Sequence, residues 1–108
     1  MSPEEQPPSI EVVERPTELH YEIRVDGELA GKAFYEREGN SRTLTHTEID
    51  SAHEGKGLGG KLAAGVFADV RARHLTVIPR CPFMVSYLQR HPDLIDVVEE
   101  PYRSELTA

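Results

Sequence analysis

The sequence is poor in cysteine and in positive charge, and it contains no long hydrophobic run. The single cysteine, Cys81, excludes an internal disulfide and fits a reducing, cytoplasmic setting. The formal net charge of −7 argues against a general binder of nucleic acid or anionic membranes, so any anion site must be local. No apolar stretch approaches the length of a membrane span, and the first residues lack a signal-peptide pattern. We therefore expect neither a nucleic-acid nor a membrane partner.

The length and composition that remain are those of one folded domain. The chain has 108 residues, of which 38% are hydrophobic and 29% charged, ordinary values for a globular protein. We expect a single domain over residues 10–102. Residues 1–9 are acidic and rich in proline, and residues 103–108 lack an apolar pattern, so both ends are predicted to be tails.

The first half of the chain has the pattern of an antiparallel sheet. Residues 10–13 predict a short strand, and apolar and polar residues alternate over residues 19–25. Asp26-Gly27 is a strong hairpin signal, which makes residues 28–37 the partner strand. After a second turn, the threonine-rich residues 41–50 predict a third long strand. Together these elements predict an antiparallel meander.

The period changes in the second half. Apolar residues recur every four positions from Leu58 to Val70, which predicts a helix of about three to four turns. Residues 75–78 then predict a short buried strand, residues 83–90 a short helix, and residues 94–98 a last short strand. A strand–helix–strand crossover gives a parallel pair of strands. The predicted fold class is therefore α+β, with a mixed α/β sheet.

A glycine-rich loop, HEGKGLGGKL over residues 53–62, lies at the start of the predicted long helix. The first N–H groups of a helix have no intrahelical partner, and glycines allow a phosphate to approach them closely. Two familiar phosphate loops fit poorly. The dinucleotide pattern Gly55-x-Gly57-x-x-Gly60 lacks the acid expected at the end of the next strand. The nucleoside-triphosphate loop needs Ser or Thr where this chain has Leu62.

The third pattern, Glu54-x-x-Gly57-x-Gly59, resembles the pyrophosphate loop of the GNAT superfamily of N-acetyltransferases, in which the first position is usually Gln or Arg. The resemblance covers residues 19–98 and is closest to the small, stand-alone GNAT-like subfamily that lacks the usual N-terminal helices. Because position 54 carries a carboxylate here, phosphate binding requires that Glu54 point away or pair with Lys56. The other matching segments are His46-Thr47-Glu48, Pro79-Arg80-Cys81-Pro82-Phe83 and Tyr87-Leu88-Gln89-Arg90-His91-Pro92.

The resemblance implies a GNAT-like acyl-CoA N-acyltransferase fold and an acetyl-CoA-dependent N-acetyltransferase, in which an amine attacks the thioester directly. The alternative function is a non-catalytic module that binds acyl-CoA or CoA. In either case the pantetheine arm is expected between the strand before the loop and the strand after the helix. The residues then expected to bind the cofactor are Ile49, Asp50, Ser51, Glu54, Gly55, Lys56, Gly57, Leu58, Gly59, Gly60 and Lys61.

Four residues are candidates for the chemistry of transfer, and no metal ligands are assigned. His46 and Glu48 lie two residues apart on one strand face, where either could accept a proton from the amine; the alternative is a half-exposed polar sheet surface. Cys81, beside Arg80 and before a helix, is expected near the acetyl group, or packs as a small buried side chain. Tyr87 is expected to protonate the leaving thiolate, or packs its ring in the core.

The acceptor is not specified by the sequence and is expected to be a small-molecule or protein amine. The acidic surface favours a cationic acceptor through electrostatic steering. The exposed face of the sheet is a candidate surface for a homodimer.

Overall fold

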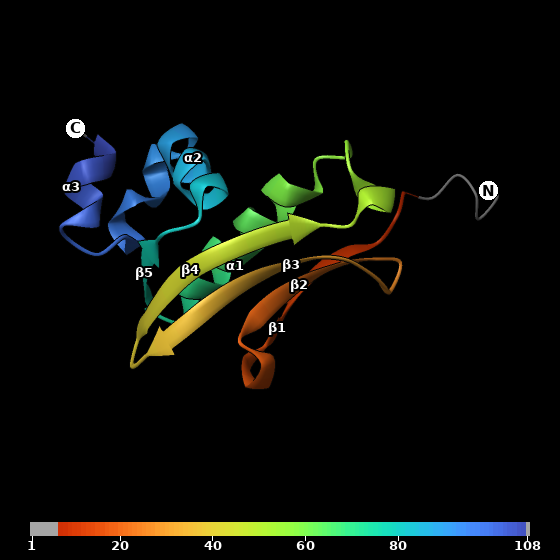
Figure 1. The fold of residues 1–108 in the computed structure, drawn as a ribbon, viewed down its shortest axis with the longest axis horizontal. Helices are drawn as coiled ribbons and strands as arrows, with labels where there is room; N and C mark the ends of the chain where they lie inside the picture. Colours follow the sequence, from red (N-terminus) through yellow and green to blue (C-terminus); the bar gives the residue numbers. More distant parts are fainter. Residues whose placement is uncertain (1–6, 108) are drawn as a thin grey trace.

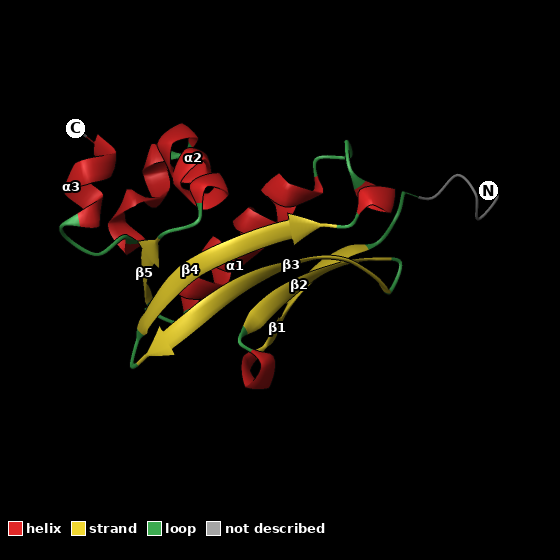
Figure 2. Cartoon of the chain, viewed as in Figure 1, coloured by secondary structure: helices red, strands yellow, loops and turns green. Residues whose placement is uncertain are grey.

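The structure is a computed structural model that describes residues 7–107. A five-stranded sheet carries helix α1 across one face, and the C-terminal helices gather beside β5 (Figures 1 and 2). The strands follow the order β1-β2-β3-β4-β5; the first four are antiparallel, and β5 is parallel to β4. The predicted meander, crossover and mixed sheet are therefore confirmed. The bounds are β1 Ile10–Arg15, β2 His20–Val25, β3 Glu28–Glu38, β4 Ser41–Ile49, α1 Leu58–Ala72, β5 Thr76–Pro79, α2 Pro82–Arg90 and α3 Tyr102–Thr107.

The main helix lies where its apolar period predicts. Its buried stripe includes Leu58, Leu62, Val66 and Val70, and it packs against the sheet residues Tyr21, Ile23 and Leu44 in one core. A close approach to β1 is possible because α1 carries Gly65, where an added Cβ would lie 2.6 Å from Cβ of Val12. This packing fixes the start of α1 beyond the end of β4, next to the glycine loop.

Two predictions about the C-terminal region are wrong. Residues 94–98 do not form a strand; Pro92–Val97 is a 3₁₀-helix, and a single bridge joins Val98 to Val77. Proline at the start favours a turn, and the buried pair of valines resembled a strand in the sequence. Residues 103–108 were predicted to be a tail, but Tyr102–Thr107 is helix α3, and its Leu106 packs against the core. Two apolar residues four apart gave too weak a pattern to predict that helix.

A buried polar cluster lies on the face of the sheet that carries no helix. His20 Nε2 is 3.0 Å from Glu22 Oε2, and both residues are buried. That hydrogen bond, aided by those from Arg24 and Arg15, lowers the pKa of Glu22 to about 2. The ring of His20 packs edge-on against Phe34, whose other neighbour is the ring of His46 at 6.0 Å between centroids. The cluster is thus connected to the ring of His46 through Phe34, which packs against both histidine rings.

None of the helices in residues 7–107 has both the length and the apolar character needed to cross a membrane.

Candidate functional site

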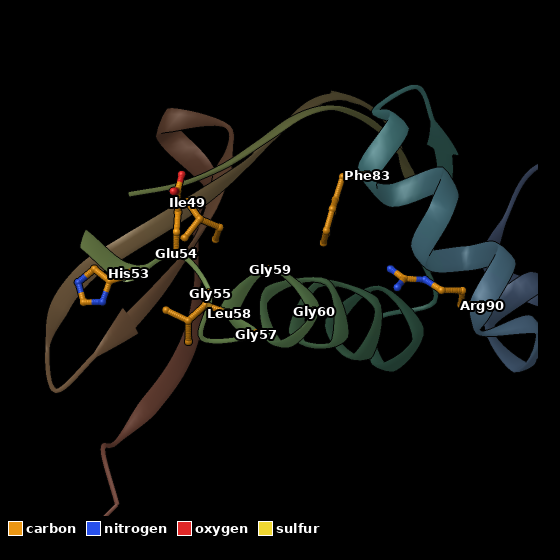
Figure 3. Close-up of a pocket in the computed structure, with 10 residues that line it drawn as sticks. All are labelled: Ile49, His53, Glu54, Gly55, Gly57, Leu58, Gly59, Gly60, Phe83 and Arg90. Atoms are coloured by element: carbon orange, nitrogen blue, oxygen red, sulfur yellow. The ribbon is translucent and has the colours of Figure 1, made fainter. Parts of the chain in front are cut away.

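A pocket of about 460 Å³ lies where the glycine loop enters α1, between that loop and helix α2 (Figure 3). It gathers much of the predicted phosphate loop together with the end of β4, and it adds side chains from α2. The lining residues are Ile49, His53, Glu54, Gly55, Gly57, Leu58, Gly59, Gly60, Phe83 and Arg90.

The loop presents a row of backbone donors to this pocket. Among the described residues, none of the six N–H groups from Gly55 to Gly60 has a hydrogen-bond acceptor; the next one, on Lys61, donates to Gly57 O at 3.3 Å. Gly57 precedes the helix with a φ of 73°, a left-handed conformation that glycine adopts without steric cost. Free N–H groups and the positive end of the helix dipole together favour a bound anion such as a phosphate.

The charged side chains of the loop do not lie among these free N–H groups. In Figure 3 the carboxylate of Glu54 points away from the loop glycines. This is the arrangement that phosphate binding requires of a carboxylate at position 54. Lys56 and Lys61 are exposed and do not line the pocket.

The cation of the pocket is Arg90, which sequence reasoning missed together with Phe83. The guanidinium of Arg90 extends from α2 toward the α1 helix, and the Phe83 ring stands above Gly59 (Figure 3). A Cβ at Gly59 would lie 2.9 Å from that ring, so only glycine fits there without a shift. The seven-residue spacing of Phe83 and Arg90, two helical turns, was the signal that they share one face.

His53 is a further residue that the sequence analysis did not identify. It is buried beneath the loop, and neither ring nitrogen has a hydrogen-bond partner among the described residues. Its Nε2 lies 3.6 Å from Oε1 of Glu28 in the β2–β3 hairpin. The loop is therefore packed on the buried imidazole of its own first residue, His53.

Strands β4 and β5 separate just before the pocket. They pair only as far as Leu44 and Pro79, and the carbonyl of Leu44 accepts from the N–H groups of both Arg80 and Cys81, at 3.0 and 2.9 Å. The register of β4 against β3 skips Thr45, a bulge that bends the strand at this point. Beyond the bulge, β4 continues to Ile49 with no partner strand on the β5 side among residues 7–107.

Backbone groups of β4 face this opening. The N–H of Asp50 donates to Ala30 O at 2.8 Å, and hydrogen bonding alternates along an antiparallel ladder. The polar backbone groups of Thr47 and Ile49 therefore point away from β3, into the gap. Asp50 and Ser51 differ, because both backbone groups of Asp50 and the carbonyl of Ser51 are already bonded within the protein.

The four candidate catalytic residues fall into three places. Cys81 is 3% exposed, and its Sγ lies 3.5 Å from Oγ1 of Thr47. His46 and Glu48 form a pair on the helix-free face, with Nε2 and Oε2 3.3 Å apart, and both side chains are more than half exposed. Because Thr47 lies between them in a strand, its side chain and theirs point to opposite faces. The structure thus places the thiol and the histidine–glutamate pair on opposite sides of β4.

Tyr87 occupies the third place. Its ring stacks between Phe67, 5.8 Å away, and His91, 4.1 Å away, and it lines a second pocket rather than the loop pocket. Burial is the main cause that raises the pKa of Tyr87, so its hydroxyl stays protonated at neutral pH.

Comparisons with known proteins agree with this geometry. The model of a family described as GCN5-related N-acetyl-transferase matches residues 20–97. A solved structure from Staphylococcus aureus, determined by NMR and named as a candidate GCN5-like N-acetyltransferase, superimposes with a TM-score of 0.62 at 23% identity. That likeness covers 82% of this chain and 87% of the other, and at this identity it shows the fold alone. A search of curated proteins found no match.

Proposed function

The chain belongs to the GCN5-related N-acetyltransferase family, and we propose that it transfers an acetyl group from acetyl-CoA to an amine by direct attack on the thioester. The observation that carries this proposal is the row of free N–H groups from Gly55 to Gly60, which lies beside the opening between β4 and β5. A nucleotide switch is disfavoured, because Leu62 stands where magnesium binding needs a hydroxyl.

In this proposal, different groups of the chain bind different parts of the acetyl donor, acetyl-CoA. Bound acetyl-CoA supplies an activated thioester. The N–H groups of the loop hold its pyrophosphate, and the backbone groups of Thr47 and Ile49 hold its arm along the free edge of β4. Cys81 lies beside Thr47 and shapes the inner wall of the opening.

The acceptor amine approaches from the helix-free face, because α1 and α2 cover the other face. There His46 or Glu48 accepts the proton that the ammonium group must lose before its nitrogen attacks the thioester carbonyl. The carbon–sulfur bond then breaks, the nitrogen gives up its second proton to solvent, and the leaving thiolate takes a proton from solvent. The proposal gives Tyr87 no part in this transfer, because Tyr87 lines the second pocket and not the loop pocket.

Calorimetry with acetyl-CoA, CoA and ATP tests the cofactor assignment. We expect acetyl-CoA and CoA to bind and ATP with magnesium to bind far more weakly, because the loop lacks the hydroxyl for the metal. Release of free thiol in the presence of a panel of amines then tests turnover. Binding without thiol release for any amine would favour the non-catalytic acyl-CoA module over the enzyme.

Replacing Cys81 with serine is expected to keep acetyl-CoA affinity and most of the activity. An acetyl relay through Cys81 would gain no free energy, since donor and acceptor thiols are chemically alike, and the thiol is almost completely buried. The measurement is mass spectrometry of the protein after incubation with acetyl-CoA and no acceptor. A stoichiometric adduct on Cys81, removed by amine at the steady-state rate, would replace direct attack with a relay.

A further inference from the structure

His53 is a buried titratable side chain that lines the glycine-loop pocket and that the transfer of the acetyl group does not use. Both of its ring nitrogens are closed off from solvent, and neither has a hydrogen-bond partner among the described residues. A buried polar group without a partner costs free energy, so native proteins contain few of them and each calls for an explanation. We therefore looked for a state of the protein in which this ring is paired.

The other buried histidine, His20, shows what a completed pair looks like in this chain. Its Nε2 lies 3.0 Å from Oε2 of Glu22, which is buried as well. The corresponding atoms of His53 and Glu28 are 3.6 Å apart, too far for a hydrogen bond, and the side chain of Glu28 is 75% exposed. A shortening of about 0.6 Å would give the His53 pair the 3.0 Å of the His20 pair. Because Glu28 is exposed, its side chain is free to make this movement.

Glu28 is the charged group best placed to pair with His53. The elements around the ring carry the charged side chains Asp26 and Glu28 in the β2–β3 hairpin, Asp50, Glu54 and Lys56 in the segment that contains His53, Lys61 in α1 and Arg90 in α2. Among the described residues, Glu28 is the one acidic side chain that comes within 4.0 Å of the ring. Figure 3 shows the carboxylate of Glu54 and the ring of His53 pointing in different directions, with Arg90 across the pocket.

A phosphate ligand at the glycine loop would change the charge beside His53. The free N–H groups from Gly55 to Gly60 follow His53 closely in the chain and belong to the same pocket. An anion held there attracts a positive charge on the ring, and this attraction is strong where protein excludes water. A neutral imidazole has a single N–H donor, whereas the imidazolium has two. With a carboxylate on one side and an anion in the pocket, the protonated ring is therefore favoured.

We propose that His53 is a positioning residue for the glycine loop, which it supports as an imidazolium paired with Glu28, and that binding of acetyl-CoA adds a proton to this ring. The proton comes from solvent and joins the unprotonated ring nitrogen, so the charge of the ring changes from zero to +1. The proposal rests on the proposed function, because acetyl-CoA is the ligand whose phosphates act on the ring.

The sign of the pH dependence follows from this proton uptake. The complex holds more protons than the free protein, so lower pH favours the complex. The affinity for acetyl-CoA should therefore rise as the pH falls through the range in which histidine titrates. The phosphates of acetyl-CoA ionise too, but this contribution is the same for a variant without the His53 ring. The difference between the wild type and such a variant isolates His53.

The test is calorimetry of acetyl-CoA binding in HEPES and in Tris, whose heats of ionisation differ, so that the change in apparent enthalpy counts the protons taken up. The wild type is expected to take up at least about half a proton more than His53→Asn near pH 7. From pH 6 to pH 8, the wild-type affinity relative to that of His53→Asn should fall by about 3- to 10-fold. Glu28→Gln keeps the ring but removes its carboxylate, and its proton uptake should lie between the two.

Two variants serve as matched controls and should take up as many protons as the wild type. His74→Asn removes an exposed histidine that does not line the pocket, and asparagine tolerates the left-handed backbone there, with a φ of 56°. Glu38→Gln removes an exposed carboxylate at the opposite end of β3 from Glu28.

Unchanged proton uptake in His53→Asn or in Glu28→Gln would overturn the proposal while leaving the proposed function intact. Because Glu28 is exposed, the second variant remains informative even if His53→Asn does not fold. Failure of acetyl-CoA to bind the wild-type protein across this pH range would overturn the proposed function itself.

Discussion

Gly57→Glu is expected to abolish the binding of acetyl-CoA, with an affinity loss of at least about 100-fold. The new carboxylate would stand at the start of α1, among the free N–H groups that hold the pyrophosphate. Like charges brought together cost several kcal/mol, and each 1.4 kcal/mol is a factor of ten in affinity. Isothermal calorimetry measures the loss directly, and thermal unfolding with and without acetyl-CoA checks it.

The control for Gly57→Glu must separate lost binding from lost stability. Gly39→Glu provides it, because Gly39 also has a positive φ, 59°, and an added Cβ there also meets nothing within 4 Å. Both variants carry the same backbone strain of about 1–2 kcal/mol and the same new charge. We expect Gly39→Glu to bind as the wild type does. Wild-type affinity in a folded Gly57→Glu protein would place the phosphate site elsewhere.

The sequence predicted those parts of the fold that depend on local patterns. Strand alternation over residues 19–25, the Asp26-Gly27 turn and the four-residue period of α1 each specify an element from adjacent residues. The segment over residues 92–107 was mispredicted because its structure depends on packing. Val97 and Val98 are buried by neighbouring elements, and α3 is held by the contact of Leu106 with the core. No local period encodes such contacts.

In the candidate site, too, the parts that depend on a local pattern were predicted and the parts that depend on packing were not. The glycine loop was predicted as a phosphate site because one continuous segment specifies it, and its free N–H row follows from the helix start. Arg90 and Phe83 could not be predicted as its opposite wall, since the sequence shows which helix face they share but not what that face meets. His53 was missed because its isolation beneath the loop is a property of the folded state.

His46→Ala is expected to lower kcat by about 100-fold while leaving acetyl-CoA affinity nearly unchanged. The loss is that of a general base. His46 lies on the helix-free face of β4, beside the opening and away from the glycine loop, so its removal should not disturb the phosphates. The pH–rate profile is the decisive measurement: the limb that reports deprotonation of the base should disappear in the variant. An unchanged profile would remove His46 from the mechanism.

Glu48→Gln tests whether the two residues act as one unit. The Oε2 of Glu48 is 3.3 Å from Nε2 of His46, close enough to orient the imidazole. If His46 is the base, Glu48→Gln should lower kcat by less than His46→Ala does, and the double variant should be little worse than His46→Ala alone. If Glu48 is the base through a water, the order of the two effects reverses. The matched control is Glu36→Gln, which removes an exposed carboxylate and should leave kcat unchanged. Glu36 pairs with Thr43, which lies before the bulge in β4, where β4 is still paired with β5 and the opening has not begun.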